Sequence, residues 1–132
     1  MAWKFDDSRS IYVQLVEQIQ VRILTGTYPP GGRLPAVREL ASEAGVNPNT
    51  MQRALAELER TGLVHSNRTS GRFVTEDTEM IEALKRSFAQ NEALVFCGRL
   101  RTLGYTTEEI VLLIRGAETD DSGENEKKGE PI

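Results

Sequence analysis

The fold is decided by residues 36–62, which read AVRELASEAGVNPNTMQRALAELERTG. Apolar residues recur at helical spacing over 36–44, which ends at Gly45, and again over 48–61, which ends at Gly62. Asn47 is a preferred helix N-cap, and Pro48 suits the first helical position, where its missing N–H has no consequence. Two short helices joined by a glycine-containing turn predict a helix-turn-helix.

The flanking segments predict a winged form of this motif. A helix is expected over 11–24, and a breaker cluster, YPPGG at 28–32, predicts a turn after it. Beyond Gly62 the apolar pattern alternates, which predicts strands over 63–66 and 72–75 around a polar turn at 67–71. A β-hairpin directly after a helix-turn-helix is a wing, so the first domain is expected to span residues 1–75.

Two further helices are predicted after the wing. They cover 79–103 and 107–117, and the second is preceded by a capping box, TTEE, at 106–109. Residues 76–118 are therefore expected to form a helical dimerisation segment, and the charged residues 119–132 a disordered acidic tail. The chain is predicted to be mainly α with a small β-hairpin.

The charge is distributed unevenly along the chain. The formal net charge is −4, but residues 1–75 hold nine Lys/Arg and seven Asp/Glu, which gives +2. Residues 76–132 hold seven basic and thirteen acidic residues, which gives −6. Because a phosphate-binding surface needs only local positive potential, the acidic total is compatible with a nucleic-acid partner in the first domain.

Several classes of protein are disfavoured by what the sequence contains. No apolar run is long enough to cross a bilayer and the first residues resemble no signal peptide, so a cytoplasmic protein is expected. Cys97 and His65 are the single cysteine and histidine, which leaves no internal disulfide and no zinc site between them. His65 has no apparent nucleophile partner. We therefore expect neither an enzyme nor a cofactor.

The start of the 48–61 helix carries the residues that indicate function. Its outer face offers hydrogen-bonding side chains, and a recognition helix must place such groups where they reach base edges in the major groove. Arg38, early in the preceding helix, is expected to contact the DNA backbone. The wing, 67–72, has a basic tip suited to a neighbouring minor groove. The predicted DNA-contact residues are Arg38, Asn47, Asn49, Thr50, Gln52, Arg53, Arg68, Ser70, Gly71 and Arg72.

Other interpretations of the same residues stay open at this stage. Any surface helix is polar on its outer face, and in an isolated helix Asn47 would be explained as a cap alone. The preceding short helix and the following hairpin favour the DNA-contact interpretation instead. A winged helix also serves in some proteins as a protein-interaction module, because a fold does not determine a function. A partner-binding version would expose apolar residues on the 48–61 helix, whereas this helix offers Asn, Thr, Gln and Arg.

Many residues between 10 and 75 also match one known pattern. They are Tyr12-Val13-Gln14, Gly26, Pro30-Gly31, Leu34-Pro35, Arg38, Leu40-Ala41, Gly45-Val46, Thr50, Ala54-Leu55, Leu58, Gly62-Leu63, Gly71 and Phe73-Val74. This pattern resembles the DNA-binding domain of GntR-family regulators, and VNPNTMQRAL at 46–55 resembles the YtrA-type subfamily. The resemblance implies a repressor that dimerises through two short C-terminal helices, without a full effector-binding domain. It places Arg38, Asn47, Asn49, Thr50, Gln52 and Gly71 at family DNA-contact positions.

The chain departs from the family pattern at two positions. The wing usually has a second glycine where this chain has Thr69, so the conformation of the wing is expected to differ. Arginine is frequent in the family where this chain has Pro48, so the base preference is expected to differ from those members.

A homodimer is the predicted assembly. One recognition helix contacts only a few base pairs, and specific binding usually needs two half-sites about 34 Å apart. The alternative is that the C-terminal helices merely cap the winged helix of their own chain. A small-molecule effector, of unknown identity, would have to bind at the dimer interface or between the domains. The predicted interface residues are Leu84, Phe88, Leu94, Val95, Leu100, Leu103 and Leu113.

Overall fold

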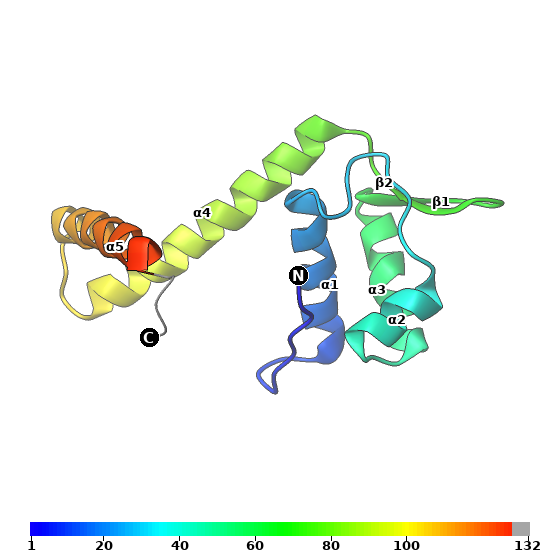
Figure 1. The fold of residues 1–132 in the computed structure, drawn as a ribbon, viewed down its shortest axis with the longest axis horizontal. Helices are drawn as coiled ribbons and strands as arrows, with labels where there is room; N and C mark the ends of the chain where they lie inside the picture. The colour runs from blue at the N-terminus through cyan, green and yellow to red at the C-terminus, as the bar shows by residue number, and fades with distance from the viewer. Residues whose placement is uncertain (128–132) are drawn as a thin grey trace. The chain divides into compact units, whose positions relative to one another are not determined.

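The computed structural model describes the backbone of residues 1–127 and the side chains of residues 1–118. The chain divides into two compact units, the first comprising Met1–Arg86 and the second beginning at Ser87. Its elements, labelled in Figure 1, are α1 (Ile11–Leu24), α2 (Val37–Ala44), α3 (Pro48–Arg60), β1 (Val64–Asn67), β2 (Gly71–Val74), α4 (Thr78–Thr102) and α5 (Thr107–Lys127). The predicted fold class, mainly α with one hairpin, is confirmed within the described residues.

The helix starts follow from local chemistry. The Ser10 hydroxyl accepts a hydrogen bond from the Val13 N–H and so caps α1, while Asn47 caps α3 and Pro48 occupies its first position. Gly45 ends α2 in the left-handed conformation with φ +70°, which a glycine adopts without steric cost. The turn of the helix-turn-helix is therefore specified by residues next to one another in the sequence.

The two strands form an antiparallel hairpin, and each strand lies one residue nearer the turn than predicted. Val64 pairs with Val74, Ser66 with Arg72 and Asn67 with Gly71. β1 begins and ends one residue later than predicted, and β2 begins and ends one residue earlier than predicted. The reason is that Asn67 and Gly71 still pair, although both residue types are typical of turns.

One hydrophobic core holds the first unit together. Helices α1, α2 and α3 and the hairpin bury their apolar faces against each other, and Ile81 from the start of α4 joins the same cluster. The first unit therefore extends past the predicted boundary at residue 75. The largest fully buried side chains are Leu15, Ile19, Ile23, Leu40, Met51, Leu55, Leu58, Leu63, Val64 and Val74.

The N-terminal segment, residues 1–9, runs along α1 and is held by a ladder of side chains. Gln14 and Gln18 exchange hydrogen bonds with the backbones of Asp6 and Lys4, respectively. Arg22, one further turn along, donates to the Met1 carbonyl and lies over the Trp3 ring. These three α1 residues are spaced four apart and so lie on one face of the helix. They satisfy the backbone of a segment that belongs to no helix or sheet.

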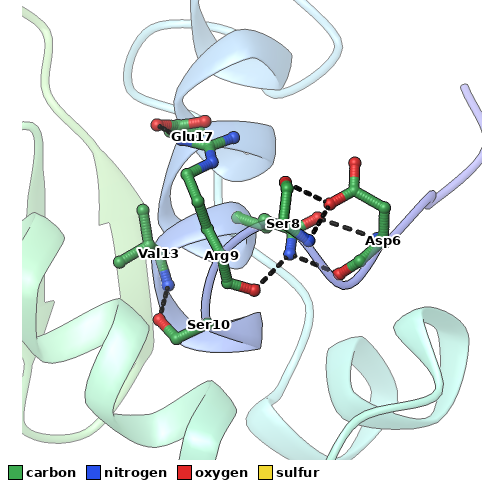
Figure 2. A network of polar contacts seen from close by, with 7 residues as sticks. Asp6, Ser8, Arg9, Ser10, Val13 and Glu17 are labelled. Carbon is green, nitrogen blue, oxygen red and sulfur yellow. Dashed lines mark hydrogen bonds and ion pairs between the residues drawn. The ribbon is translucent and has the colours of Figure 1, made fainter.

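Short-range polar contacts order the end of this segment before α1 begins (Figure 2). Ser8 donates to the Asp6 carboxylate through both its hydroxyl and its amide, and Arg9 forms an ion pair with Glu17. The two donors from Ser8 hold the pKa of the Asp6 carboxyl below its usual value.

The second unit contains most of α4 and all of α5. The predicted capping box is present, because Thr106 and Glu109 each accept from the backbone N–H of the other. Ile110 is buried. Helix α5 continues to Lys127, although a disordered tail is predicted from residue 119, and residues 128–132 lie outside the described part. A helix once nucleated adds one hydrogen bond per residue, so it extends through polar sequence.

Neither α4 nor α5, nor any other described helix, is long and apolar enough to span a bilayer.

Candidate nucleic-acid interface

The side chains predicted to read DNA lie on the outer edge of α3. Asn49, Gln52 and Arg53 are exposed, while Met51 and Ala54, on the opposite face, are fully buried. Leu55 and Leu58 are buried as well. Since packing holds one face of α3 in the core, its polar edge has a fixed orientation toward solvent.

The first turn of α3 combines a cap with exposed polar groups. The Asn47 side-chain oxygen accepts from the Asn49 N–H at 2.7 Å. This cap engages the side-chain amide oxygen of Asn47, and the NH₂ group of the same side chain forms no hydrogen bond among the described residues. Thr50 is half-buried. Since Pro48 has no N–H and the Asn49 N–H is bonded to Asn47, the Thr50 N–H is the donor left in this turn, and the positive end of the helix dipole favours a negatively charged ligand such as a phosphate.

Arg53 is restrained by an aromatic ring from another helix. Its guanidinium carbon lies 4.6 Å from the centre of the Tyr12 ring on α1, which is a cation–π contact. Arg53 remains exposed in this arrangement. Its charge is therefore available at the surface, and the ring limits the side chain to fewer conformations than a free arginine would sample.

Helix α2 presents a second positive site. Its N-cap residue, Ala36, offers no side-chain hydrogen bond, so the first backbone N–H groups are left without a side-chain partner. Arg38 is exposed within that first turn and forms no ion pair among the described residues. An uncapped helix start next to an arginine is well suited to a backbone phosphate.

The wing closes without the second glycine that the family usually has. Asn67 accepts two bonds from Thr69, one from its N–H and one from its hydroxyl, each at 3.2 Å. No described residue other than glycine has a positive φ, so Thr69 needs no glycine-like conformation. Gly71, with φ +100°, supplies that conformation instead. Arg68 and Ser70 are exposed at the tip.

Arg33 lies beside the wing and is missing from the predicted set. Residues 31–34 pair with β2, since Leu34 donates to the Arg72 carbonyl and Val74 donates to the Gly32 carbonyl, both at 2.9 Å. This pairing brings the exposed Arg33 side chain against Gly71, where a Cβ would meet its Nε at 3.2 Å. No short-range pattern could reveal it, because the contact joins segments far apart in the sequence.

Arg72 is the one predicted contact residue that forms an ion pair among the described residues. Its Nε donates to Glu59, near the end of α3, at 3.0 Å, and its side chain is 19% exposed. His65, on the outer side of the hairpin, stacks on Phe73 with the ring centres 5.9 Å apart. The structure thus brings Arg38, Arg68 and the α3 edge to the surface, and it places Arg72 against α3.

The predicted interface residues differ in exposure. Leu94, Val95, Leu103 and Leu113 are exposed, whereas Phe88 and Leu100 are half-buried. Leu84 is also half-buried and packs on the core of the first unit. Other large apolar side chains of the second unit are exposed as well, and these are Phe96, Tyr105, Val111, Leu112 and Ile114.

Comparison with known proteins identifies close relatives. Residues 11–74 match the profile described as "Bacterial regulatory proteins, gntR family". The chain is 38% identical over 108 residues to the uncharacterized HTH-type transcriptional regulator YhcF of Bacillus subtilis (strain 168). This alignment covers 82% of the chain and 89% of YhcF. The chain is 40% identical over 72 residues to the HTH-type transcriptional repressor YtrA of the same organism, covering 54% of this chain and 55% of YtrA.

A solved structure has the same fold over most of its length. It is a GntR family transcriptional regulator from Listeria monocytogenes, with a TM-score of 0.81 and 42% sequence identity. The match covers 85% of this chain and 98% of that one.

Proposed function

Because the chain belongs to the gntR family of bacterial regulatory proteins, we propose that it represses transcription as a homodimer bound to a palindromic operator. Membership makes it a transcription regulator with an N-terminal DNA-binding domain, and the family is not one of enzymes. The observation that carries the proposal is the exposed polar edge of α3, held outward by the buried opposite face.

In the proposed complex, α3 enters the major groove and the wing approaches the minor groove. Asn49 and Gln52 have the amide groups that pair with adenine, and Arg53 suits guanine or a phosphate. Arg38 and the start of α2 hold a backbone phosphate. At the wing, Arg68, Ser70 and Gly71 form the proposed contact, and the exposed Arg33 adds a positive charge beside them.

The homodimer accounts for the apolar surface of the second unit. Leu94 and Leu103 are 70% and 73% exposed in the single chain. Several exposed leucines on one surface are unusual for a protein that acts as a monomer. A two-fold partner buries the same patch on both copies and supplies the second recognition helix that a palindrome requires. Exposed apolar residues on α4 and α5 support this assembly.

Repression is proposed from the relatives. YtrA, to which the chain is 40% identical over 72 residues, is named a transcriptional repressor. Because operator DNA in a bacterium is cytoplasmic, we place the protein in that compartment. The dimer interface is the site proposed for a small-molecule effector.

The proposal is tested by selecting DNA from a random-sequence pool with the purified protein. We expect enrichment of an inverted repeat with half-sites about one helical turn apart. Gln52→Ala and Arg38→Ala should each weaken binding to that operator by about 1–3 kcal/mol in gel-shift titrations, with unchanged thermal unfolding. Arg60→Ala, at the far end of α3, is the matched control and should bind as the wild type does.

Two outcomes would contradict the proposal. Absence of any enriched sequence would argue against operator binding. Wild-type affinity in both Gln52→Ala and Arg38→Ala would show that the contact surface lies elsewhere.

A further inference from the structure

Glu59 joins three elements of the first unit through one carboxylate oxygen. The residue lies near the end of α3, and its Oε1 accepts from Arg72 Nε on β2 at 3.0 Å. The same oxygen accepts from the Ser66 hydroxyl on β1. A single acidic side chain on the proposed recognition helix therefore holds both strands of the wing.

The strand register explains why these residues meet. Ser66 and Arg72 are paired across the hairpin, two residues along from the Val64–Val74 pair. Since side chains alternate between the faces of a strand, the two pairs lie on the same face. Val64 and Val74 are buried against the core. The polar pair continues this inner face beyond the apolar core, where Glu59 meets it.

The ion pair is partly withdrawn from water. The side chains of Arg72 and Glu59 are 19% and 28% exposed, whereas Arg60, paired with Glu57 one turn earlier on α3, is 70% exposed. Charges that are partly buried are screened less by salt than exposed ones. The Arg72 charge is therefore balanced by Glu59, whereas Arg33, Arg38 and Arg68 are exposed to solvent.

We infer that Glu59 is a positioning residue that determines DNA specificity, by fixing the wing against α3 and by keeping the Arg72 charge from DNA phosphates. This inference rests on the proposed function. It assigns Arg72 a different role from the direct DNA contact that the sequence predicts. Because Glu59 balances the Arg72 charge, the wing adds less sequence-independent attraction to DNA phosphates. The fixed hairpin also keeps the wing tip at a constant position relative to the recognition helix.

The first test compares Glu59→Gln with Glu57→Gln. Each variant removes one negative charge from α3 and breaks one pair with an arginine, but only the first releases the wing. Binding to a random-sequence duplex is measured as a function of salt concentration. Glu59→Gln should steepen the slope of log K against log salt by about 0.9 and raise non-specific affinity roughly five- to tenfold at 0.1 M salt. Glu57→Gln should do neither.

The second test uses the double variant Glu59→Gln/Arg72→Gln, which removes both charges and leaves no unpaired carboxylate to repel phosphate. If Glu59 balances the Arg72 charge in the wild type, the non-specific salt slope of the double variant equals that of the wild type. If Arg72 instead contacts a phosphate directly in the wild type, the slope of the double variant falls by about 0.9. Circular dichroism confirms that each variant is folded.

The outcomes separate the inference from the function on which it rests. A wild-type protein that binds no duplex overturns both. A wild-type protein that binds, together with a shallower slope in the double variant than in the wild type or equal slopes in the two glutamate variants, overturns only the inference. The ratio of operator to random-sequence affinity should fall in Glu59→Gln and stay constant in Glu57→Gln.

Discussion

At the residue scale, arginines of the first unit have different roles that their positions in the sequence do not distinguish. Arg22 is 3% exposed, and burial lowers its pKa while it lies over Trp3 and bonds to backbone carbonyls. Arg72 is paired with Glu59, whereas Arg38 faces solvent. The count of basic residues therefore overstates the charge that is available to DNA. Only contacts with neighbours determine which arginines are available.

A residue-scale prediction concerns Asp6, whose carboxyl pKa is lowered by two donors from Ser8. A carboxyl with a lowered folded-state pKa stabilises the fold above its unfolded value, about 3.9, and loses that contribution as the pH falls through the folded value. Ser8→Ala removes the hydroxyl and leaves the amide, so the pKa of Asp6 should rise partway toward its usual value. NMR titration of the Asp6 carboxyl carbon measures the change.

Ser42→Ala, an exposed serine-to-alanine change on α2, is the control and should leave the Asp6 titration as in the wild type. An identical Asp6 titration in Ser8→Ala and wild type would mean that the hydroxyl contact does not form in solution.

At the element scale, the helices begin where short sequence signals predict, although α5 continues past its predicted end at residue 117 to Lys127. α1 begins after Ser10, α3 after Asn47, and α5 after the Thr106 capping box. The hairpin is less well predicted, since Asn67 and Gly71 extend the strands by one pair. A cap is satisfied within its own turn, whereas a strand ends where its partner ends.

The N-cap of α3 allows stability and DNA binding to be separated. Asn47→Ala removes the bond to the Asn49 N–H and should cost about 1 kcal/mol of unfolding free energy. Asn47→Asp keeps the cap and favours the positive helix end, so the unfolding free energy should be maintained. The added negative charge should nevertheless repel phosphate and weaken operator binding. Chemical denaturation and gel-shift titration measure the two effects.

Ser10→Asp places the same charge at the N-cap of α1, outside the proposed contact surface, and should leave operator affinity near the wild-type value. Equal losses of affinity in Asn47→Asp and Ser10→Asp would indicate a general charge effect rather than a local contact.

At the scale of the whole molecule, the two units differ in how completely they bury their apolar residues. The first unit has a continuous core, and Leu40 and Leu55 are fully buried in it. In the second unit, Ile110 is buried while Leu94, Leu103 and Leu112 stay mostly exposed. This contrast is the physical basis of the proposed homodimer.

The assembly is tested by light scattering on the full chain. A single chain has a mass of 14.7 kDa, and we expect about twice that for the wild type. Leu94→Glu and Leu103→Glu should each yield the monomer and lose most operator affinity, because the charge would be buried in the interface. Val21→Glu, at an exposed position on α1, is the control and should remain dimeric.

A mass of 14.7 kDa for the wild type at micromolar concentration would contradict the homodimer. If Leu94→Glu and Leu103→Glu both remain dimeric, the dimer interface lies on another surface.

The order of the helices, the turn between α2 and α3, and the polar edge of α3 all follow from the amino-acid sequence without knowledge of the fold. Those features depend on caps such as Asn47 and on periodicity within a few residues, so a short window contains the necessary information. The folded chain was needed to show that Arg72 pairs with Glu59, that Arg33 lies against Gly71, and that Arg22 holds the N-terminal segment. Each of these contacts joins residues distant in sequence, and their partners are chosen by chain packing and strand register, which no local pattern encodes.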